Sequence, residues 1–64
     1  MIRVNGDEDH FYGEDVATLL ERRHIESRGV AVAIDGEVVP RSTWSNTIVA
    51  DDSVVEIVTA AAGG

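Results

Sequence analysis

One stretch of the sequence decides the fold: Val30-Ala31-Val32-Ala33-Ile34-Asp35-Gly36-Glu37-Val38-Val39-Pro40. Its first five residues alternate and predict a strand with the three larger side chains on one face. Asp35-Gly36 is a two-residue hairpin turn, so Glu37-Val38-Val39 is expected to return as the partner strand. Pro40 cannot donate a ladder hydrogen bond, and the second strand therefore ends there or lies at an edge of the sheet.

A second hairpin is predicted at the start of the chain. Residues 2–4 alternate between apolar and polar, and Asn5-Gly6 follows them as the strongest type of short hairpin signal. We expect the return strand to include His10, Phe11 and Tyr12, with Asp7-Glu8-Asp9 making it weak and edge-like. Gly13 then breaks the strand pattern.

One amphipathic helix is predicted between the two hairpins. It starts near Asp15, a good N-cap residue, and Val16, Leu19 and Leu20 have the i, i+3, i+4 spacing of an apolar stripe. Acidic residues lie near its positive end and basic residues near its negative end, as the helix dipole favours. The helix therefore has one face to bury.

The chain after Pro40 leads into a last strand. Residues 41–50 are expected to be irregular, with Trp44 and Ile48 as packing anchors, and residues 51–53 form a turn. Residues 54–58 predict a strongly apolar strand, which favours a central place in the sheet.

The order of these elements predicts an α+β fold in which one helix packs across one face of a mixed sheet. We expect a single domain over residues 1–58 and a flexible tail over residues 59–64. The predicted core lies between the helix and the sheet and consists of Val16, Leu19, Leu20, Val30, Val32, Ile34, Val55 and Ile57.

Size and charge exclude several classes of protein. A chain of 64 residues has room for one small domain and none for a deep catalytic pocket beside a core. The net charge of −7 argues against nucleic acid as a partner, because phosphate binding needs a cationic face. No apolar run approaches the roughly 20 residues that span a bilayer, so we expect no membrane partner and take the cytoplasm as the default location.

The side chains offer little catalytic chemistry. The chain has no cysteine, and His10 and His24 lack the spacing of metal ligands, so no metal site is expected. Asp7-Glu8-Asp9 and Asp51-Asp52 fall in predicted turns, where solvated carboxylates are the simpler interpretation. The hydroxyl side chains that lack a matching base for a catalytic triad are Ser42, Thr43 and Ser45. The sequence therefore predicts no catalytic residue on this chain.

The C-terminal residues offer a different function. Gly63-Gly64 has no Cβ atoms, so its backbone can enter a narrow channel and present a terminal carboxylate inside another protein's active site. That arrangement is typical of a carrier protein. The alternatives are a frayed end that tolerates small residues and a remnant of an expression vector, and the tail by itself leaves these open.

The last strand also predicts a docking surface. If Val55 and Ile57 face the helix, then Val54, Glu56 and Val58 face the other side of the sheet, because strand side chains alternate. Exposed valines beside a functional tail favour a partner-binding patch, although scattered exposed apolar residues are also normal.

Four segments, residues 2–6, 16–20, 32–44 and 52–64, resemble the ThiS family of sulfur carriers in thiamin biosynthesis. The most specific part is the run Gly36-Glu37-Val38-Val39-Pro40-Arg41-Ser42 followed by Trp44, whereas the diglycine is shared by all β-grasp carriers. The chain departs from the family pattern in having Asp35-Gly36 for the commoner Asn-Gly, and Ser53 where an arginine or lysine is frequent.

The resemblance implies a ubiquitin-like β-grasp fold and a carrier that is not itself an enzyme. Gly64 would be adenylated by a partner enzyme that uses ATP, and then converted to a thiocarboxylate by sulfur derived from cysteine. A thiazole synthase would receive that sulfur, and the carrier itself would bind no cofactor. The tail residues that would enter the partner are Ala60, Ala61, Ala62 and Gly63, and the partner-binding residues would be Val54, Val58 and Thr59.

Two alternatives remain open at this point. A sulfur carrier for molybdopterin synthesis shares the tail and the chemistry, although such chains tend to have prolines where this one has alanines before the diglycine. A ubiquitin-like protein modifier would instead join Gly64 to a lysine through an isopeptide bond.

Overall fold

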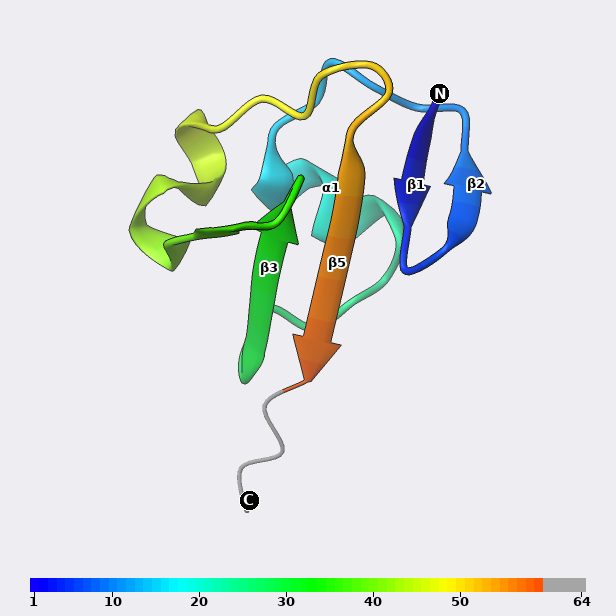
Figure 1. The fold of residues 1–64 in the computed structure, drawn as a ribbon. Coiled ribbons are helices and arrows are strands. Elements are labelled where there is room, and N and C mark those ends of the chain that lie inside the picture. The colour runs from blue at the N-terminus through cyan, green and yellow to red at the C-terminus, as the bar shows by residue number, and fades with distance from the viewer. Residues whose placement is uncertain (60–64) are drawn as a thin grey trace.

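Two hairpins and a final strand form one mixed sheet in the computed structural model, which describes residues 1–59 (Figure 1). The strand order is β2-β1-β5-β3-β4, and β1 and β5 are parallel while the other neighbours are antiparallel. The elements are β1 (Ile2–Val4), β2 (Asp7–Asp9), α1 (Val16–Arg22), β3 (Val30–Ile34), β4 (Glu37–Val39), the 3-10 helix η1 (Arg41–Asn46) and β5 (Val54–Thr59). The predicted α+β fold is confirmed, with β5 at the centre and β4 at an edge.

Both hairpins turn on two residues in the left-handed region of backbone space. Asn5 and Gly6 have φ angles of 51° and 87°, and Asp35 and Gly36 have the same pair of values. Positive φ at both central positions defines the turn type that matches the twist of the flanking strands. Asparagine, aspartate and glycine tolerate that conformation best, which explains why these dipeptides close the hairpins.

The return strand of the first hairpin differs from the prediction. The tight turn places Val4 opposite Asp7. The ladder then ends where Ile2, the first residue of β1, pairs with Asp9. β2 is therefore the acidic stretch Asp7–Asp9, while His10, Phe11 and Tyr12 lie beyond it and are exposed. Because β1 has only three residues, the aromatic residues have no strand to pair with, in spite of their stronger strand propensity.

The last strand runs one residue further than predicted. Thr59 pairs with Val30 of β3, so this residue belongs to β5 although the sequence analysis assigned it to the tail. Residues 60–64 lie outside the described residues.

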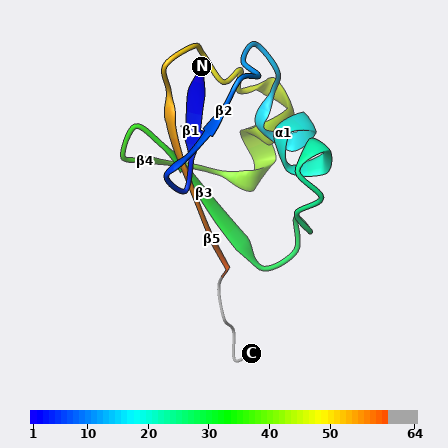
Figure 2. The ribbon, with the colours of Figure 1, turned by 90° about the vertical axis from the view of Figure 1, so that its right-hand side faces the viewer.

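Helix α1 packs across one face of the sheet, as Figure 2 shows. Asp15 caps it, since its side chain accepts a hydrogen bond from the backbone N–H of Thr18 at 2.7 Å. Hydrogen bonds from the side chain and from the backbone N–H of Thr18 lower the pKa of Asp15. The helix buries Val16, Leu19 and Leu20 against the sheet, which confirms the predicted apolar stripe.

The core is only partly the predicted one. Val32 and Val55 are buried with the helix stripe, but Val30, Ile34 and Ile57 are only half-buried at its margin. The buried residues that complete the core are Ile2, Val4, Trp44 and Val49.

The segment between η1 and β5 explains why one of the two predicted packing anchors is exposed. Val49 donates to the backbone oxygen of Glu14 and accepts from the backbone N–H of Gly13, both at 2.8 Å. These bonds hold the segment extended and turn Val49 inward, so its neighbour Ile48, the predicted anchor, is 60% exposed. Trp44, the other predicted anchor, is buried, and its indole N–H donates to the oxygen of Val39 at 2.9 Å.

Candidate functional site

The outer face of the sheet is the side that α1 does not cover. Along β5, Val55 is buried toward the helix while Val54, Glu56 and Val58 are exposed on the outer face. The predicted alternation is therefore confirmed for the first part of the strand. Ile57 follows it less completely, because it is half-buried.

A shallow apolar depression of about 540 Å³ lies on this outer face. Val54 and Val58 of β5 border it, and Val38 of β4 borders its other side with 73% of its surface exposed. The small side chains of Ala31 and Ala33 on β3 lie between these valines and leave the space hollow. We call this set of five residues the valine depression.

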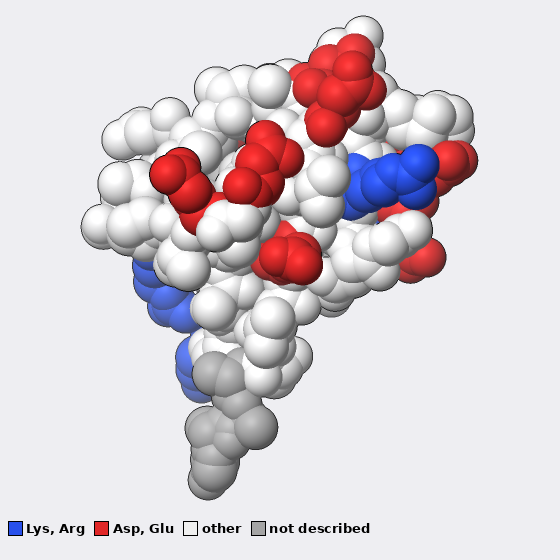
Figure 3. All heavy atoms as spheres, in the orientation of Figure 1, with Lys and Arg blue, Asp and Glu red and all other residues white. Residues whose placement is uncertain are grey.

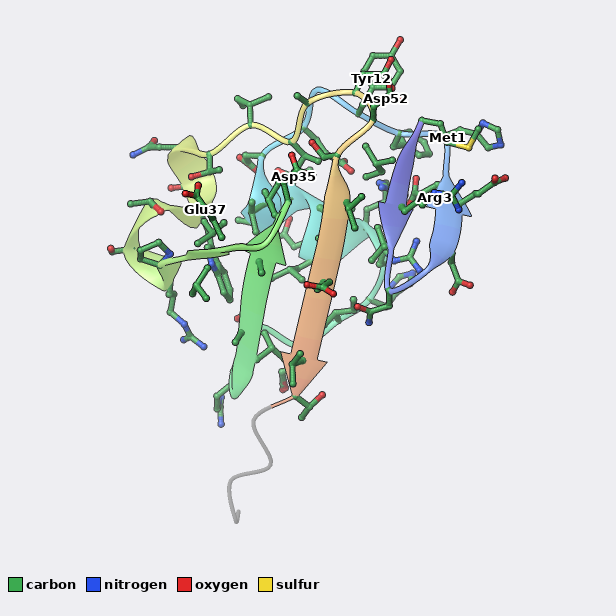
Figure 4. All side chains as sticks on the ribbon, in the orientation of Figure 1. Met1, Arg3, Tyr12, Asp35, Glu37 and Asp52 are labelled. Carbon is green, nitrogen blue, oxygen red and sulfur yellow. The ribbon has the colours of Figure 1, made fainter. Side chains whose placement is uncertain are left out.

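Carboxylates gather over the part of this face away from the end of β5 (Figure 3). Figure 4 places Asp35, Glu37 and Asp52 there, whereas Arg3 lies to the side on β1. An apolar depression with an acidic border fits a partner surface that has apolar side chains at its centre and basic groups around them.

Val38, Ala31 and Ala33 are the members of the valine depression that were not predicted from the sequence as site residues. The pairing of Ala33 with both Val38 and Glu56 places these side chains on the same face. The signal was present in the two-residue turn at Asp35-Gly36, because counting outward from it pairs Ala33 with Val38.

The predicted site residues divide between two parts of the chain. Val54, Val58 and Thr59 are described and exposed, and they lie on one strand whose carboxyl end leads to the tail. The tail residues and the predicted sulfur-bearing residue lie outside the described residues; they are Ala60, Ala61, Ala62, Gly63 and Gly64.

A cluster of charged side chains joins β2 to α1. Asp9 is 6% exposed and accepts hydrogen bonds from the guanidinium groups of Arg22, at 3.1 Å, and Arg23, at 2.7 Å. Glu14 binds the same Arg22 at 2.6 Å. The interpretation of Asp9 as part of a solvated turn is wrong, because the acidic residues form β2 and its last residue faces the end of the helix.

This cluster stabilises the fold and lowers the pKa of Asp9. Burial would raise the pKa of this carboxyl, but the hydrogen bond from the backbone N–H of Phe11 and those from Arg23 and Arg22 outweigh it. The pKa is held at about 2. Because both acids of the cluster are already paired with arginines, we interpret it as a structural salt-bridge cluster that holds β2 against the end of α1.

Replacing Asp9 by asparagine should weaken this salt-bridge cluster. In the unfolded chain this carboxyl takes up its proton near the usual aspartate pKa of 3.8, above the folded pKa of about 2, so the stabilisation is complete above pH 4 and disappears as the pH falls to 2. Asp9→Asn should therefore lower the free energy of unfolding at pH 7 by roughly 2 kcal/mol and flatten its dependence between pH 2 and 4.

The measurement is urea unfolding of both proteins across that pH range. Asp7→Asn changes an exposed carboxylate of the same strand and should shift the free energy of unfolding at pH 7 by less than about 0.5 kcal/mol. An Asp9→Asn variant as stable as Asp7→Asn would contradict the structural role of the salt-bridge cluster.

The remaining candidates for chemistry are exposed and isolated. Within residues 1–59, no group of three histidine, cysteine, aspartate or glutamate side chains is arranged to hold a metal ion. His10 and His24 are exposed and far apart in the sequence. The hydroxyl residues of η1 are also exposed. None of the helices in this part of the chain is both long and apolar enough to cross a membrane.

Comparisons with known proteins agree with this arrangement. The model of the ThiS family matches residues 2–64. A crystal structure of the thiamine biosynthesis protein ThiS from Geobacter metallireducens is similar with a TM-score of 0.83 and 30% sequence identity. The similarity covers 98% of this chain and 97% of that one. No curated protein matches the sequence.

The family match spans nearly the whole chain, and the similar structure has the same β-grasp sheet with one helix across it. The chain therefore belongs to the ThiS family.

Proposed function

We propose that this chain is a sulfur carrier for the thiazole half of thiamin, with the Gly64 carboxylate as the group that carries the sulfur. The observation that carries the proposal is the ThiS family match, which runs through residue 64 and so includes the diglycine. The fold supports it, because the carboxyl end of the central strand β5 leads directly into the tail.

A carboxylate needs activation before sulfur can replace one of its oxygens. The Gly64 carboxylate attacks the α-phosphorus of ATP on an adenylating enzyme, and pyrophosphate leaves. A persulfide sulfur derived from cysteine then attacks the carbonyl carbon and expels AMP. A thiol attacks the outer sulfur of the resulting acyl disulfide, which forms a new disulfide with that sulfur and releases a thiocarboxylate on Gly64.

The thiocarboxylate is anionic at neutral pH and nucleophilic through sulfur. It delivers this sulfur to a thiazole synthase that works on a sugar-phosphate-derived imine. In this account the carrier supplies the reactive atom and the docking surface, and the two partner enzymes supply the catalysis. ATP binds to the adenylating enzyme, and no cofactor is assigned to the carrier.

The valine depression is the surface that we assign to docking. Val58 exposes 61% of its surface next to the strand end that leads to the tail, and Val54 exposes 46% at the start of the same strand. A partner that covers them buries apolar surface and at the same time receives Thr59 and the residues that follow it. Docking and delivery of the carboxylate are then one event.

Placing a charge in the depression should weaken docking. Val58→Asp should reduce affinity for the adenylating enzyme about tenfold or more, because an ionised carboxylate would be buried without a partner. Isothermal titration calorimetry measures the affinity, and thermal melting checks the fold. Ile48→Asp is the matched control, since Ile48 is 60% exposed but lies outside the depression. Equal affinities for the two folded variants would remove the depression from the account.

The activation step can be tested by exchange of labelled pyrophosphate into ATP. The adenylating enzyme should catalyse this exchange only when the carrier is added, because reversal of acyl-adenylate formation needs the Gly64 carboxylate. Exchange that does not depend on the carrier would contradict the proposal. A denaturing gel of cell extract then tests the modifier alternative, since a modifier gives bands of higher mass and a carrier stays at its own.

A further inference from the structure

The side chain of Asn5 holds the central strand near the point where it leads into the tail. Its Oδ1 accepts from the backbone N–H of Ile57 at 2.8 Å, and its Nδ2 donates to the backbone oxygen of Ile57 at 3.1 Å. These two bonds join residues that are 52 positions apart in the sequence. We call this pair of bonds the Asn5 clamp.

The clamp takes the place of a missing residue of β1. The parallel ladder between β1 and β5 proceeds from Arg3, whose N–H donates to Ser53, to Asn5, whose N–H donates to Val55. The next group of β5 in this ladder is the backbone N–H of Ile57. Asn5, however, has a φ of 51°, and the backbone after it turns away into β2. The amide side chain, which carries both a donor and an acceptor, then continues the ladder where the backbone has left it.

The two hairpin turns bind different ends of β5. In the other hairpin, Asp35 has the same φ of 51°, and its Oδ1 accepts from the backbone N–H of Val54 at 2.9 Å. Val54 is the first residue of β5, and Figure 4 shows Asp35 beside the start of that strand. The two turns therefore hold opposite ends of the same strand, and Asn5 holds the end from which the tail departs.

We propose that Asn5 is a positioning residue for the C-terminal carboxylate, an inference that rests on the proposed function. Residues 60–64 reach at most roughly 18 Å when fully extended, so the carboxylate arrives in the partner's site only if the strand before it starts from a fixed place. The clamp gives Ile57 a partner on the β1 side, while β3 pairs with it on the other. Without the clamp, β5 beyond Val55 is held on one side, and the residues that fray must be ordered again on docking.

The test compares Asn5→Gly with Asp35→Gly. Glycine tolerates the positive φ at both turns, so each variant keeps its hairpin and loses only the side-chain bonds to β5. Both should lose some thermal stability. In amide hydrogen exchange, Ile57 should lose protection in the first variant and Val54 in the second.

The rate of pyrophosphate release by the adenylating enzyme decides the inference, at a temperature where both variants are fully folded. At a carrier concentration that saturates the enzyme, Asn5→Gly should lower kcat about tenfold, because a misplacement near 1 Å has effects of this order or larger. Asp35→Gly removes one carboxylate of the acidic border and should raise KM, while its kcat stays near wild type. Equal kcat values for the two variants, or an unprotected Ile57 amide in the wild type, would overturn the inference. A wild-type chain that releases no pyrophosphate contradicts the proposed function itself, and the positioning role then falls with it.

Discussion

Deleting Gly64 should abolish sulfur loading and leave the fold intact. The shortened chain would end about 3.5 Å earlier, and a displacement of even 1 Å at a reacting centre can slow a reaction by about a hundredfold. Residues 1–59 hold the buried core that the structure describes, so the melting temperature should not change. Intact mass spectrometry after incubation with the adenylating enzyme, ATP and a sulfur donor measures the loading.

A second tail variant separates position from composition. Ala62→Gly keeps the chain length and the terminal carboxylate, so it should still be loaded with sulfur. Adding one residue after Gly64 should abolish loading as the deletion does, because the carboxylate is again displaced. Loading of the shortened or the extended chain at the wild-type rate would contradict the assignment of Gly64.

Replacing Leu20 by alanine should have the largest effect on stability. Leu20 is 1% exposed and lies in the helix stripe that packs on the sheet, so its truncation removes buried apolar surface and leaves a cavity. The free energy of unfolding should fall by about 2–5 kcal/mol, a large part of the total for so small a domain. Urea denaturation monitored by circular dichroism gives this number.

An exposed residue of the same helix provides the control. Glu21→Ala replaces an exposed side chain of α1, at a position that takes no part in the capping by Asp15. Its effect should stay within about 0.5 kcal/mol. A change below about 1 kcal/mol for Leu20→Ala would mean that the apolar stripe of α1 is assigned to the wrong face.

Features that depend on neighbouring residues were predictable from the sequence. Asn5-Gly6 and Asp35-Gly36 predicted both turns, because positive φ is a local property of these residue types. The helix stripe followed from a spacing of three and four residues, and Asp15 was recognised as its cap.

Features that depend on pairing between distant segments were not predictable in the same way. The extent of β2 depends on how many residues β1 has to offer, and the inward turn of Val49 depends on its bonds to Gly13 and Glu14. The burial of Asp9 depends on the two arginines that the end of α1 brings to it. None of these contacts leaves a periodic signal in the sequence.

The candidate site shows the same division. Alternation along β5 placed Val54 and Val58 on the outer face, since the period of two is local. Asn5 was recognised only as a turn residue, because its bonds to Ile57 require β1 and β5 to lie side by side in register. The place of Gly64 stays a prediction, since it lies outside the described residues.

The measurement that tests the account most directly is fragmentation mass spectrometry of the wild-type chain after incubation with the adenylating enzyme, ATP and a sulfur donor. The account predicts that the chain gains the mass of one sulfur and loses that of one oxygen, and that every fragment carrying this change contains Gly64. A mass change located on any other residue would contradict it. An unchanged mass would also contradict it, provided that pyrophosphate exchange shows the adenylating enzyme to be active.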